Sequence, residues 1–494
     1  MKPDLKMYKY LSQRYRAILG YTGLVCFISG LTLLAPLLAL PVYPEEIIWA
    51  WGYLLPGLTL ALVGAIGWKS LVPKQALSLT LSEGSVIVVL AWIVSILAST
   101  FPLMTTAGLT FTQAIFEATS GWTTTGLSVV DVGQASHLTL LFRSVIELVG
   151  GAGLAIVTLS ALAGPVGASL PAAEGRTEQL APNVRRSAKL VLSIYSGYIA
   201  IGIVALRIAG MGWFDAINHA FAALSTGGFS TQADSIGYWD NPAIEAVTIV
   251  LMLGGTINFV TSYLLLTGRF KSVVRNGEIR LQALLIPAST ALLFFGVTTR
   301  LYPIAGKAFR VALFEMVSAL STTGFSTVGY TDWNSLGWLV MIVLMLIGGG
   351  AGSTAGGIKQ YRIYVLYRSL LWEVKRMMLP QHAVTEPRSW QGENQHFLSD
   401  ALIRQVSVLV SLYLLVFGIG SCVTVAYGYS LPDSLFEYAS TLSTVGLSVG
   451  VTAADAPTGL LWTQTIGMFL GRLEFFTVFV GLIRLYKDVP ALLR

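Results

Sequence analysis

Charged side chains are scarce in this sequence. Asp, Glu, Lys and Arg make up only 11% of its 494 residues, whereas they make up about a quarter of a soluble globular protein. Hydrophobic residues reach 54%, and the mean hydropathy is +0.70. The shortage of charge excludes an ordinary soluble domain and predicts an integral membrane protein that lies in lipid.

Side chains that commonly carry chemistry are also few. The two cysteines, Cys26 and Cys422, both lie in apolar stretches, which argues against a disulfide framework. None of the four histidines is paired at the spacing of metal ligands. Hydrolase motifs such as HExxH are missing, and the string GSTAGG at 352–357 lacks the Lys-Ser ending of a phosphate-binding loop. We therefore predict that the protein is not an enzyme.

Long apolar stretches recur from one end of the chain to the other. A helix needs about 20 apolar residues to cross a bilayer. The first stretch is too long for the apolar part of a signal peptide, so we expect it to be retained. The stretches are 18–40, 50–68, 80–99, 141–163, 190–209, 244–266, 282–299, 336–350, 405–427 and 459–483.

Basic residues cluster between alternate stretches. Because cytoplasmic loops carry an excess of Lys and Arg, we assign these clusters, and the N-terminus with them, to the cytoplasm. The longest cytoplasmic segment, 359–404, could lie on anionic headgroups or dock a partner, and we leave both interpretations open. We do not expect nucleic acid as a partner. The segments that then face outward are 41–49, 101–140, 210–243, 301–335 and 428–458.

One short pattern occurs once in each of the last four outward segments, which marks an internal repeat. Its copies are WTTTGLS (122–128), LSTGGFS (224–230), LSTTGFS (320–326) and LSTVGLS (442–448). Nine residues before each glycine stands an acidic or imidazole side chain, at Glu117, His219, Glu315 and Glu437. Each copy thus belongs to a unit of an apolar helix, a short amphiphilic helix, a Thr/Gly turn and a second apolar helix.

The short helix of each unit cannot cross a bilayer, and irregular backbone is tolerated there only when it is buried or lines a water-filled path. We therefore expect four re-entrant pore loops. Glycine lets carbonyl groups turn to one side, and four such loops around one axis would offer oxygens in place of a cation's hydration shell. The predicted filter residues are Thr124, Thr125, Gly126, Thr226, Gly227, Gly228, Thr322, Thr323, Gly324, Thr444, Val445 and Gly446.

Other interpretations of these residues exist. Small residues also let helices pack closely in lipid, but that explanation does not account for four copies in register. For the three glutamates that precede the glycines, we favour hydrogen bonds that hold the loops over charges that attract ions. The histidine in the fourth equivalent place supports this choice.

These motifs resemble the Trk/Ktr/HKT superfamily of cation transporters, and the two extra N-terminal stretches make the chain most similar to its TrkH/TrkG branch. The resemblance covers the whole chain. It implies an all-α polytopic membrane protein with four helix–pore loop–helix repeats around one pseudo-fourfold pore, plus two N-terminal transmembrane helices. The corresponding divisions are 1–75 for the N-terminal helices, then 76–175, 176–275, 276–398 and 399–494 for the four units.

The resemblance also implies a function and partners. We expect a homodimer with one pore in each chain, located in the bacterial cytoplasmic membrane, and a cytosolic ring of TrkA-type regulatory subunits that binds the nucleotide. Potassium is the expected cargo, and no covalent cofactor is expected. In the superfamily, glycine at all four filter positions accompanies potassium and serine at the first accompanies sodium, so Gly126 predicts potassium uptake.

Two departures make the four loops unequal. The second loop has Gly227 where the third has Thr323, and the fourth has Val445. We expect fewer well-formed ion sites than in a symmetric channel, and modest selectivity over sodium. The repeats all run in one direction, which favours a channel-like path. A sodium- or proton-coupled symporter and a poorly selective sodium/potassium pathway stay open as alternatives.

A glycine-rich string, GGGAGSTAGG, interrupts the last helix of the third unit, and Arg472 stands in the middle of the apolar stretch 459–483. A central arginine costs about 2.5–3.5 kcal/mol in a membrane helix, so it should face a cavity or a partner. We expect loop and arginine to meet in the ion path as a gate. The alternative is an arginine that pairs with Glu474 or a carbonyl for stability alone. The predicted gate residues are Gly348, Gly349, Gly350, Gly352, Ser353, Thr354, Gly356, Gly357 and Arg472.

Overall fold

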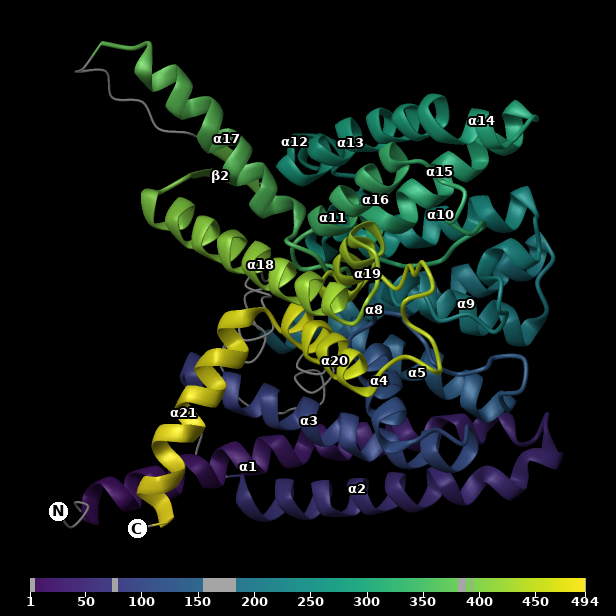
Figure 1. Cartoon of the computed structure of the whole chain (residues 1–494). Coiled ribbons are helices and arrows are strands. Elements are labelled where there is room, and N and C mark those ends of the chain that lie inside the picture. Colours follow the sequence, from purple (N-terminus) through teal and green to yellow (C-terminus); the bar gives the residue numbers. More distant parts are fainter. Residues whose placement is uncertain (1–4, 73–78, 154–183, 381–387, 392–393, 494) are drawn as a thin grey trace.

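The computed structural model describes residues 5–72, 79–153, 184–380, 388–391 and 394–493. These residues form stacked layers of helices (Figure 1), with the N-terminal pair at the bottom and the third unit at the top. The N-terminal pair consists of α1 (Leu5–Leu34) and α2 (Ala50–Leu71), joined by η1 (Ala35–Ala39) and η2 (Pro44–Trp49). The two helices pack at glycines, since a Cβ added to Gly64 would lie 2.4 Å from the backbone nitrogen of Phe27.

The order of long helix, short helix, turn and second helix then occurs four times. The long helices are α3 (Leu81–Thr106), α8 (Val184–Ala209), α13 (Gly277–Leu293) with η4 (Phe294–Thr298) and α14 (Thr299–Leu301), and α18 (Asp400–Ala426). The short helices are α4 (Phe111–Trp122), α9 (Trp213–Ser225), α15 (Ala305–Ser321) and α19 (Leu431–Leu442). The second helices are α5 (His137–Ala152), α10 (Pro242–Thr256) with α11 (Phe259–Leu266), α16 (Ser335–Ile347) with α17 (Gln360–Met377), and α20 (Thr458–Arg472) with α21 (Phe475–Leu493).

Short elements connect these helices. A 3-10 helix, η3 (Ser235–Tyr238), and a short α-helix, α12 (Phe270–Arg275), lie between longer helices, and α17 is followed by the antiparallel strands β1 (Arg388–Gln391) and β2 (Asn394–Phe397). This hairpin corrects the all-α prediction in one detail. The predicted unit boundaries at 75 and 175 lie outside the described residues. Those at 275 and 398 fall between elements, and the division itself stays a prediction.

Within the described residues, six helices are long and apolar enough to cross a membrane, and up to eight if each bent pair is one span. The bent pairs are α10 with α11, at 115°, and α20 with α21, at 102°. The expectation of continuous apolar helices over 244–266 and 459–483 was therefore wrong. At the first break the side chain of Asn258 accepts a hydrogen bond from the amide of Val260 at 2.7 Å and starts a new helix. At the second, Glu474 has a positive φ of 54°.

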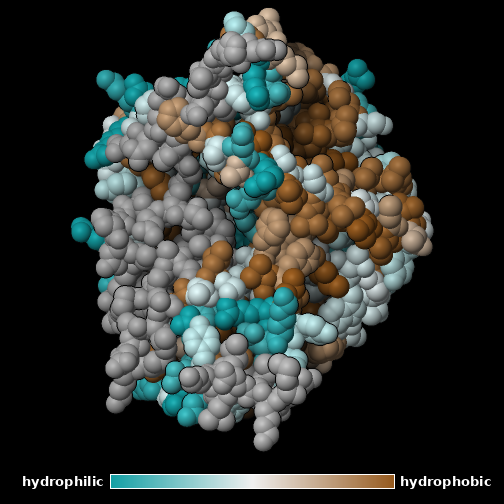
Figure 2. All heavy atoms as spheres, turned by 90° about the vertical axis from the view of Figure 1, so that its left-hand side faces the viewer, coloured by the Kyte–Doolittle hydropathy of each residue, from teal (hydrophilic) through white to brown (hydrophobic). Residues whose placement is uncertain are grey.

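Helix α17 extends from the body on one side (Figure 1). Figure 2 faces this side and shows hydrophilic side chains along the middle and lower parts beside a hydrophobic area. On α17 several large apolar side chains are exposed, among them Leu370 and Met377. Because α17 carries both basic and exposed apolar side chains, contact with headgroups and contact with a partner both stay open for this helix.

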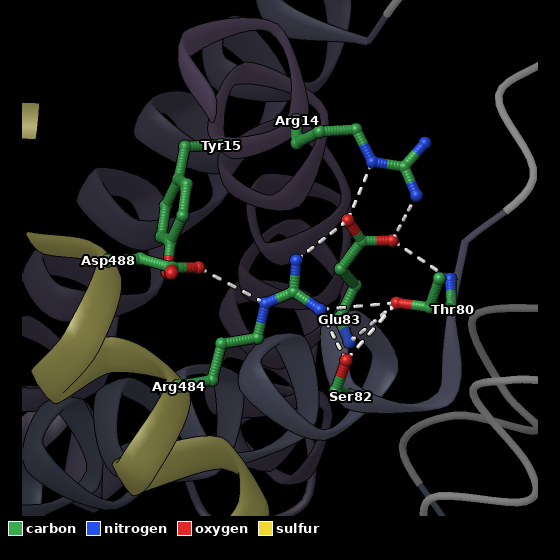
Figure 3. A network of polar contacts seen from close by, with 7 residues as sticks. All are labelled: Arg14, Tyr15, Thr80, Ser82, Glu83, Arg484 and Asp488. Atoms are coloured by element: carbon green, nitrogen blue, oxygen red, sulfur yellow. Dashed lines mark hydrogen bonds and ion pairs between the residues drawn. The ribbon is translucent and has the colours of Figure 1, made fainter. Parts of the chain in front are cut away.

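A cluster of charged side chains joins the ends of α1, α3 and α21 (Figure 3). The carboxylate of Glu83 is fully buried and accepts hydrogen bonds from Arg14, with Nε at 2.6 Å, and from Arg484, with Nη2 at 3.1 Å. Arg484 also pairs with Asp488 at 3.2 Å, and Asp488 accepts a bond from the hydroxyl of Tyr15 at 3.1 Å. The far end of α21 is thereby fastened to the N-terminal half of the molecule.

We expect Glu83→Ala to lower the stability of the protein by about 3 kcal/mol or more, because removal of one partner from a buried ion pair leaves the other charges uncompensated. The measurement is the thermal unfolding midpoint in detergent. The control is Glu373→Ala, which removes a pair with Arg376 that is exposed and 3.7 Å long; its effect should stay below about 1 kcal/mol. Equal midpoints for the two variants would contradict the prediction.

Candidate ion pathway

The four short helices end in the same backbone turn. The residue two before each glycine has a left-handed conformation, with φ of 54° at Thr124, 54° at Thr226, 57° at Thr322 and 52° at Thr444. The next amide nitrogen then donates to a carbonyl oxygen five residues earlier, for example from Thr125 to Ser120 at 2.8 Å. This is the hydrogen bond that closes many helix C-termini. A left-handed threonine is strained relative to glycine, so its presence in all four loops indicates that the turn is held by its surroundings.

The glycines of the four loops form a closed ring, which we call the glycine ring (Gly126, Gly228, Gly324 and Gly446). A Cβ added to each would lie 1.9–2.2 Å from the carbonyl oxygen of the residue that precedes the glycine in the next loop. Gly126 meets loop two in this way, Gly228 meets loop three, Gly324 meets loop four, and Gly446 returns to loop one. All four also have φ between 83° and 97°. Both the angle and the lack of space require glycine.

One cavity of about 710 Å³ has all four glycines in its lining. It also contacts the residues that follow them, including Ser128, Ser230, Ser326 and Ser448. The structure thus brings one predicted filter residue from each loop, the ring glycine, to the lining of one cavity. A ring of carbonyl oxygens in such a place can take over part of a cation's hydration shell.

Buried carboxylates hold three of the loops from behind. Glu117, Glu315 and Glu437 are 0% exposed. Each accepts a hydrogen bond from the amide three residues after its glycine, at Val129 (2.9 Å), Thr327 (2.7 Å) and Val449 (3.0 Å). The predicted hydrogen bonds from these glutamates to the loops are confirmed, and the absence of a role in attracting ions stays a prediction. Glu117 also pairs with buried Arg143 at 2.8 Å, which offsets its charge.

The predicted glycine-rich loop at 348–357 lies directly against threonines of the predicted filter. Its backbone is irregular between α16 and α17. The hydroxyl of Thr226 donates to that of Thr354 at 3.2 Å, and the amide of Gly356 donates to the hydroxyl of Thr322 at 2.7 Å. A Cβ on Gly356 would lie 2.1 Å from the hydroxyl of Thr444. The loop therefore contacts the threonines of three of the four loops.

Arg472 lies at the last residue of α20, where the helix bends, and not in the middle of a continuous helix as the sequence suggested. Its guanidinium donates to the carbonyl of Thr354 in the glycine-rich loop at 2.5 Å and to the carbonyl of Gly150 at the end of α5 at 2.7 Å. The alternative pairing with Glu474 was wrong, because Glu474 pairs with Arg362 at 2.7 Å. Bonds to carbonyls are present, and whether they serve only stability stays open.

Comparison with known proteins identifies the family. The TrkH profile, described as a cation transport protein, matches residues 58–487. The chain belongs to the TrkH family of cation transport proteins. Because this is a family of transporters, the prediction that the chain is not an enzyme is confirmed, as is the resemblance to the TrkH/TrkG branch.

Relatives of this TrkH-family chain match it over nearly their whole length. An uncharacterized cation transporter of Methanocaldococcus jannaschii is 31% identical, over 97% of each chain. The Trk system potassium uptake protein TrkH of Escherichia coli K12 is 31% identical, over 94% of this chain and 98% of its own. The crystal structure of the potassium transporter TrkH from Vibrio parahaemolyticus superposes with a TM-score of 0.82 at 28% identity, again over 94% and 98%.

Sequence reasoning missed several residues that hold the glycine-rich loop of this TrkH-family protein. The carboxylate of Glu278 accepts from the amide of Ala351 at 2.7 Å, and the side chain of Gln360 donates to the carbonyl of Gly348 at 2.9 Å. Asn258 donates to the carbonyl of Ala351. The one available signal was the position of Asn258, a polar residue inside the apolar stretch 244–266.

We expect Gly324→Ala to lower cation flux by about tenfold or more. The added Cβ would lie 1.9 Å from the carbonyl oxygen of Val445, and a backbone forced out of place costs on the order of 1–3 kcal/mol. The measurement is cation uptake into vesicles at equal protein levels. The control is Gly329→Ala in the same cavity, where a Cβ meets nothing within 4 Å. Normal flux through the Gly324 variant would contradict the ring.

Proposed function

We propose that this protein takes potassium into the cell through one pore per chain, as the membrane subunit of a Trk-type uptake system. The closed glycine ring is the observation that carries the proposal, because it gives four unequal loops one shared set of carbonyl oxygens. The printed names of the E. coli and Vibrio relatives, which are potassium uptake proteins or transporters, support potassium as the cargo. The proposed site is bacterial cytoplasmic membrane, with the N-terminus inside.

The chemistry of the proposed filter is substitution of water by protein oxygens. A potassium ion that leaves the outer cavity would exchange hydration water for carbonyl oxygens of the loops and, further in, for the threonine hydroxyls. The residues that contribute these oxygens are the twelve filter residues predicted from the sequence. The carboxylates of Glu117, Glu315 and Glu437 do not contact the ion, since each is bonded to loop amides behind the filter.

In the same proposal the glycine-rich loop is the gate. It occupies the inner side of the filter by contact with Thr226 and Thr322, and Arg472 holds it through the carbonyl of Thr354. The next helix, α17, begins at Gln360 and is tied to the bend of the fourth unit by the Arg362–Glu474 pair. A movement of α17 would therefore displace both the glycine-rich loop and the segment that carries Arg472. In this proposal that displacement opens the ion path.

Two further parts of the proposal concern partners. We propose that two chains form a dimer with separate pores, and that a cytosolic TrkA-type ring with bound nucleotide moves α17. A detergent mass corresponding to one chain, or uptake at full rate without a ring, would contradict these parts. A sodium- or proton-coupled symporter is the second candidate, and dependence of uptake on a sodium or proton gradient would favour it.

The test of potassium uptake uses cells that lack their own potassium transporters. Expression of the chain with a regulatory subunit should restore growth at low potassium. Gly126→Ser should raise sodium uptake relative to potassium severalfold, because its side chain would displace the carbonyl of Gly227, 2.2 Å from the added Cβ. The control is Gly133→Ser, where the nearest atom to a Cβ is a side-chain oxygen at 3.3 Å. No restored growth, or an unchanged ion ratio, would refute the assignment.

The gate has its own test. We expect Arg472→Ala to raise potassium flux in the absence of the regulatory subunit by about tenfold or more, the factor that corresponds to loss of one hydrogen bond to a charged group, about 1.5–3 kcal/mol. Ion preference should stay unchanged. The control is Arg310→Ala, which removes an arginine bound to Asp240 and Glu245 away from the loop. A lower flux, or a flux that still requires the regulator, would contradict the gating role.

A further inference from the structure

The second loop lacks a side chain at one position, and a side chain from another unit occupies that space. It has Gly227 at the place where the other loops have Thr125, Thr323 and Val445. A Cβ on Gly227 would lie 2.3 Å from the carboxyl carbon of Glu147 and 2.6 and 2.7 Å from its two oxygens. Glu147 belongs to α5, the second helix of unit one. The space that a side chain would occupy in loop two is therefore taken by a carboxyl group from the neighbouring unit.

The same carboxyl group also bonds to loop two. Glu147 is 0% exposed, and its Oε1 accepts a hydrogen bond from the amide of Phe229 at 3.0 Å. Phe229 directly follows Gly228 of the glycine ring. In the other loops the supporting carboxylate bonds three residues after the glycine. The carboxyl group of Glu147 is thus bonded to an amide that lies two residues closer to the ring glycine than the bonded amides of the other loops.

The short helix of the second unit cannot supply this support. His219 stands where the other units have a glutamate, and its Nε2 lies 3.0 Å from the hydroxyl of Ser230. No described amide of loop two bonds to the ring of His219. The imidazole therefore leaves the backbone of this loop without the carboxylate that the other three loops receive from their own helices, and Glu147 takes that role.

The equivalent positions in units two and four hold methionine, where unit one has Glu147. One shared contact aligns the second helices of units one, two and four. A Cβ added to Gly150, Gly255 or Gly471 would lie 1.9–2.6 Å from a carbonyl oxygen, that of the residue four positions before a ring glycine. Three residues before these glycines stand Glu147, Met252 and Met468. Met468 lies in a buried cluster with Leu127, which follows Gly126 as Phe229 follows Gly228. A glutamate beside loop two thus stands at the position where, in unit four, a methionine packs against Leu127 of loop one.

We propose that Glu147 is a positioning residue that sets the ion preference of the filter from outside the second loop. Its carboxyl group fills the place of the missing side chain at Gly227 and fixes the Phe229 amide, and with it the carbonyl groups of Gly227 and Gly228. It contacts no ion itself. This inference rests on the proposed function of the glycine ring as a cation filter.

The first test is a double-mutant cycle with the ratio of potassium to sodium uptake as the readout. Glu147→Met alone should reduce the ratio by about fivefold, the factor that corresponds to one hydrogen bond of about 1 kcal/mol. Gly227→Thr alone should reduce it at least as much, because the threonine meets the carboxyl group. The double variant has the residue types of unit four and loop one, a methionine as at Met468 and a threonine as at Thr125, and should return the ratio to within about twofold of the parental value. Independent effects that add in the double variant would overturn the proposal.

A second pair of variants adds no bulk and separates position from charge. Glu147→Gln keeps the length and an acceptor oxygen, so the ratio should stay parental. Glu147→Asp keeps the charge but withdraws the oxygen from the Phe229 amide, so the ratio should fall. The opposite result, with loss in the glutamine variant alone, would overturn positioning in favour of charge. An unchanged ratio in both the aspartate and methionine variants would assign Glu147 to packing alone.

The same measurements separate this inference from the proposed function. The ratio is taken for the parental chain first. A parental chain that passes sodium faster than potassium would refute potassium uptake, while the Glu147 variants would still report whether the ratio depends on this residue. A parental chain that prefers potassium, with variants that keep that preference at equal protein levels, would retain the proposed function and overturn the role of Glu147.

Discussion

The contact between each ring glycine and a carbonyl oxygen of the next loop sets the geometry on which the rest of this structure depends. With a hypothetical Cβ only 1.9–2.2 Å from that oxygen, the four loops lie as close as backbones allow. A left-handed threonine precedes each glycine by two residues. Such a turn is costly in isolation, and it persists here because buried hydrogen bonds behind the loops hold it from several directions.

The second helices that follow the loops are broken in units two, three and four. The second helices of units two and four bend by 115° and 102°, and that of unit three is interrupted by the glycine-rich loop. Ended helices expose carbonyl groups that need donors. Arg472 supplies donors to Gly150 and Thr354, and Gln360 supplies one to Gly348. The positive charge of Arg472 and the carbonyl groups of Gly150 and Thr354 would each cost free energy if they were buried without a partner. Here they stabilise one another.

The four units differ in what supports their loops and still form one closed ring, because the support can come from a neighbouring unit. Units one, three and four hold their loops with a glutamate from their own short helix, whereas unit two has His219 there and receives Glu147 from unit one. The absence of a side chain at Gly227 and the presence of Glu147 are complementary in space. The glycine that distinguishes loop two in the sequence, Gly227, is therefore compensated by a side chain of unit one, Glu147.

The sequence by itself determined the class of protein, the repeated order of helices and turns, and the hydrogen bonds of Glu117, Glu315 and Glu437 to their loops, because these depend on local composition and on spacings that repeat along the chain. It also indicated that Arg472 and the glycine-rich loop meet, as the bond from Arg472 to the carbonyl of Thr354 shows. The bends at 257–258 and 473–474 could not be predicted, because the apolar pattern continues across both and the interruption depends on Asn258 and Glu474 in three dimensions.

Only the tertiary structure decided which group stands behind loop two. Gly227 and Glu147 are 80 residues apart in the chain, and nothing in either helix pattern connects them. The same holds for Glu474, which pairs with Arg362 although Arg472 is nearer in sequence. Spacing along a chain fixes which residues share a helix face, but the partner of a buried charge depends on how separate helices pack, and that information exists only once the units close around one axis.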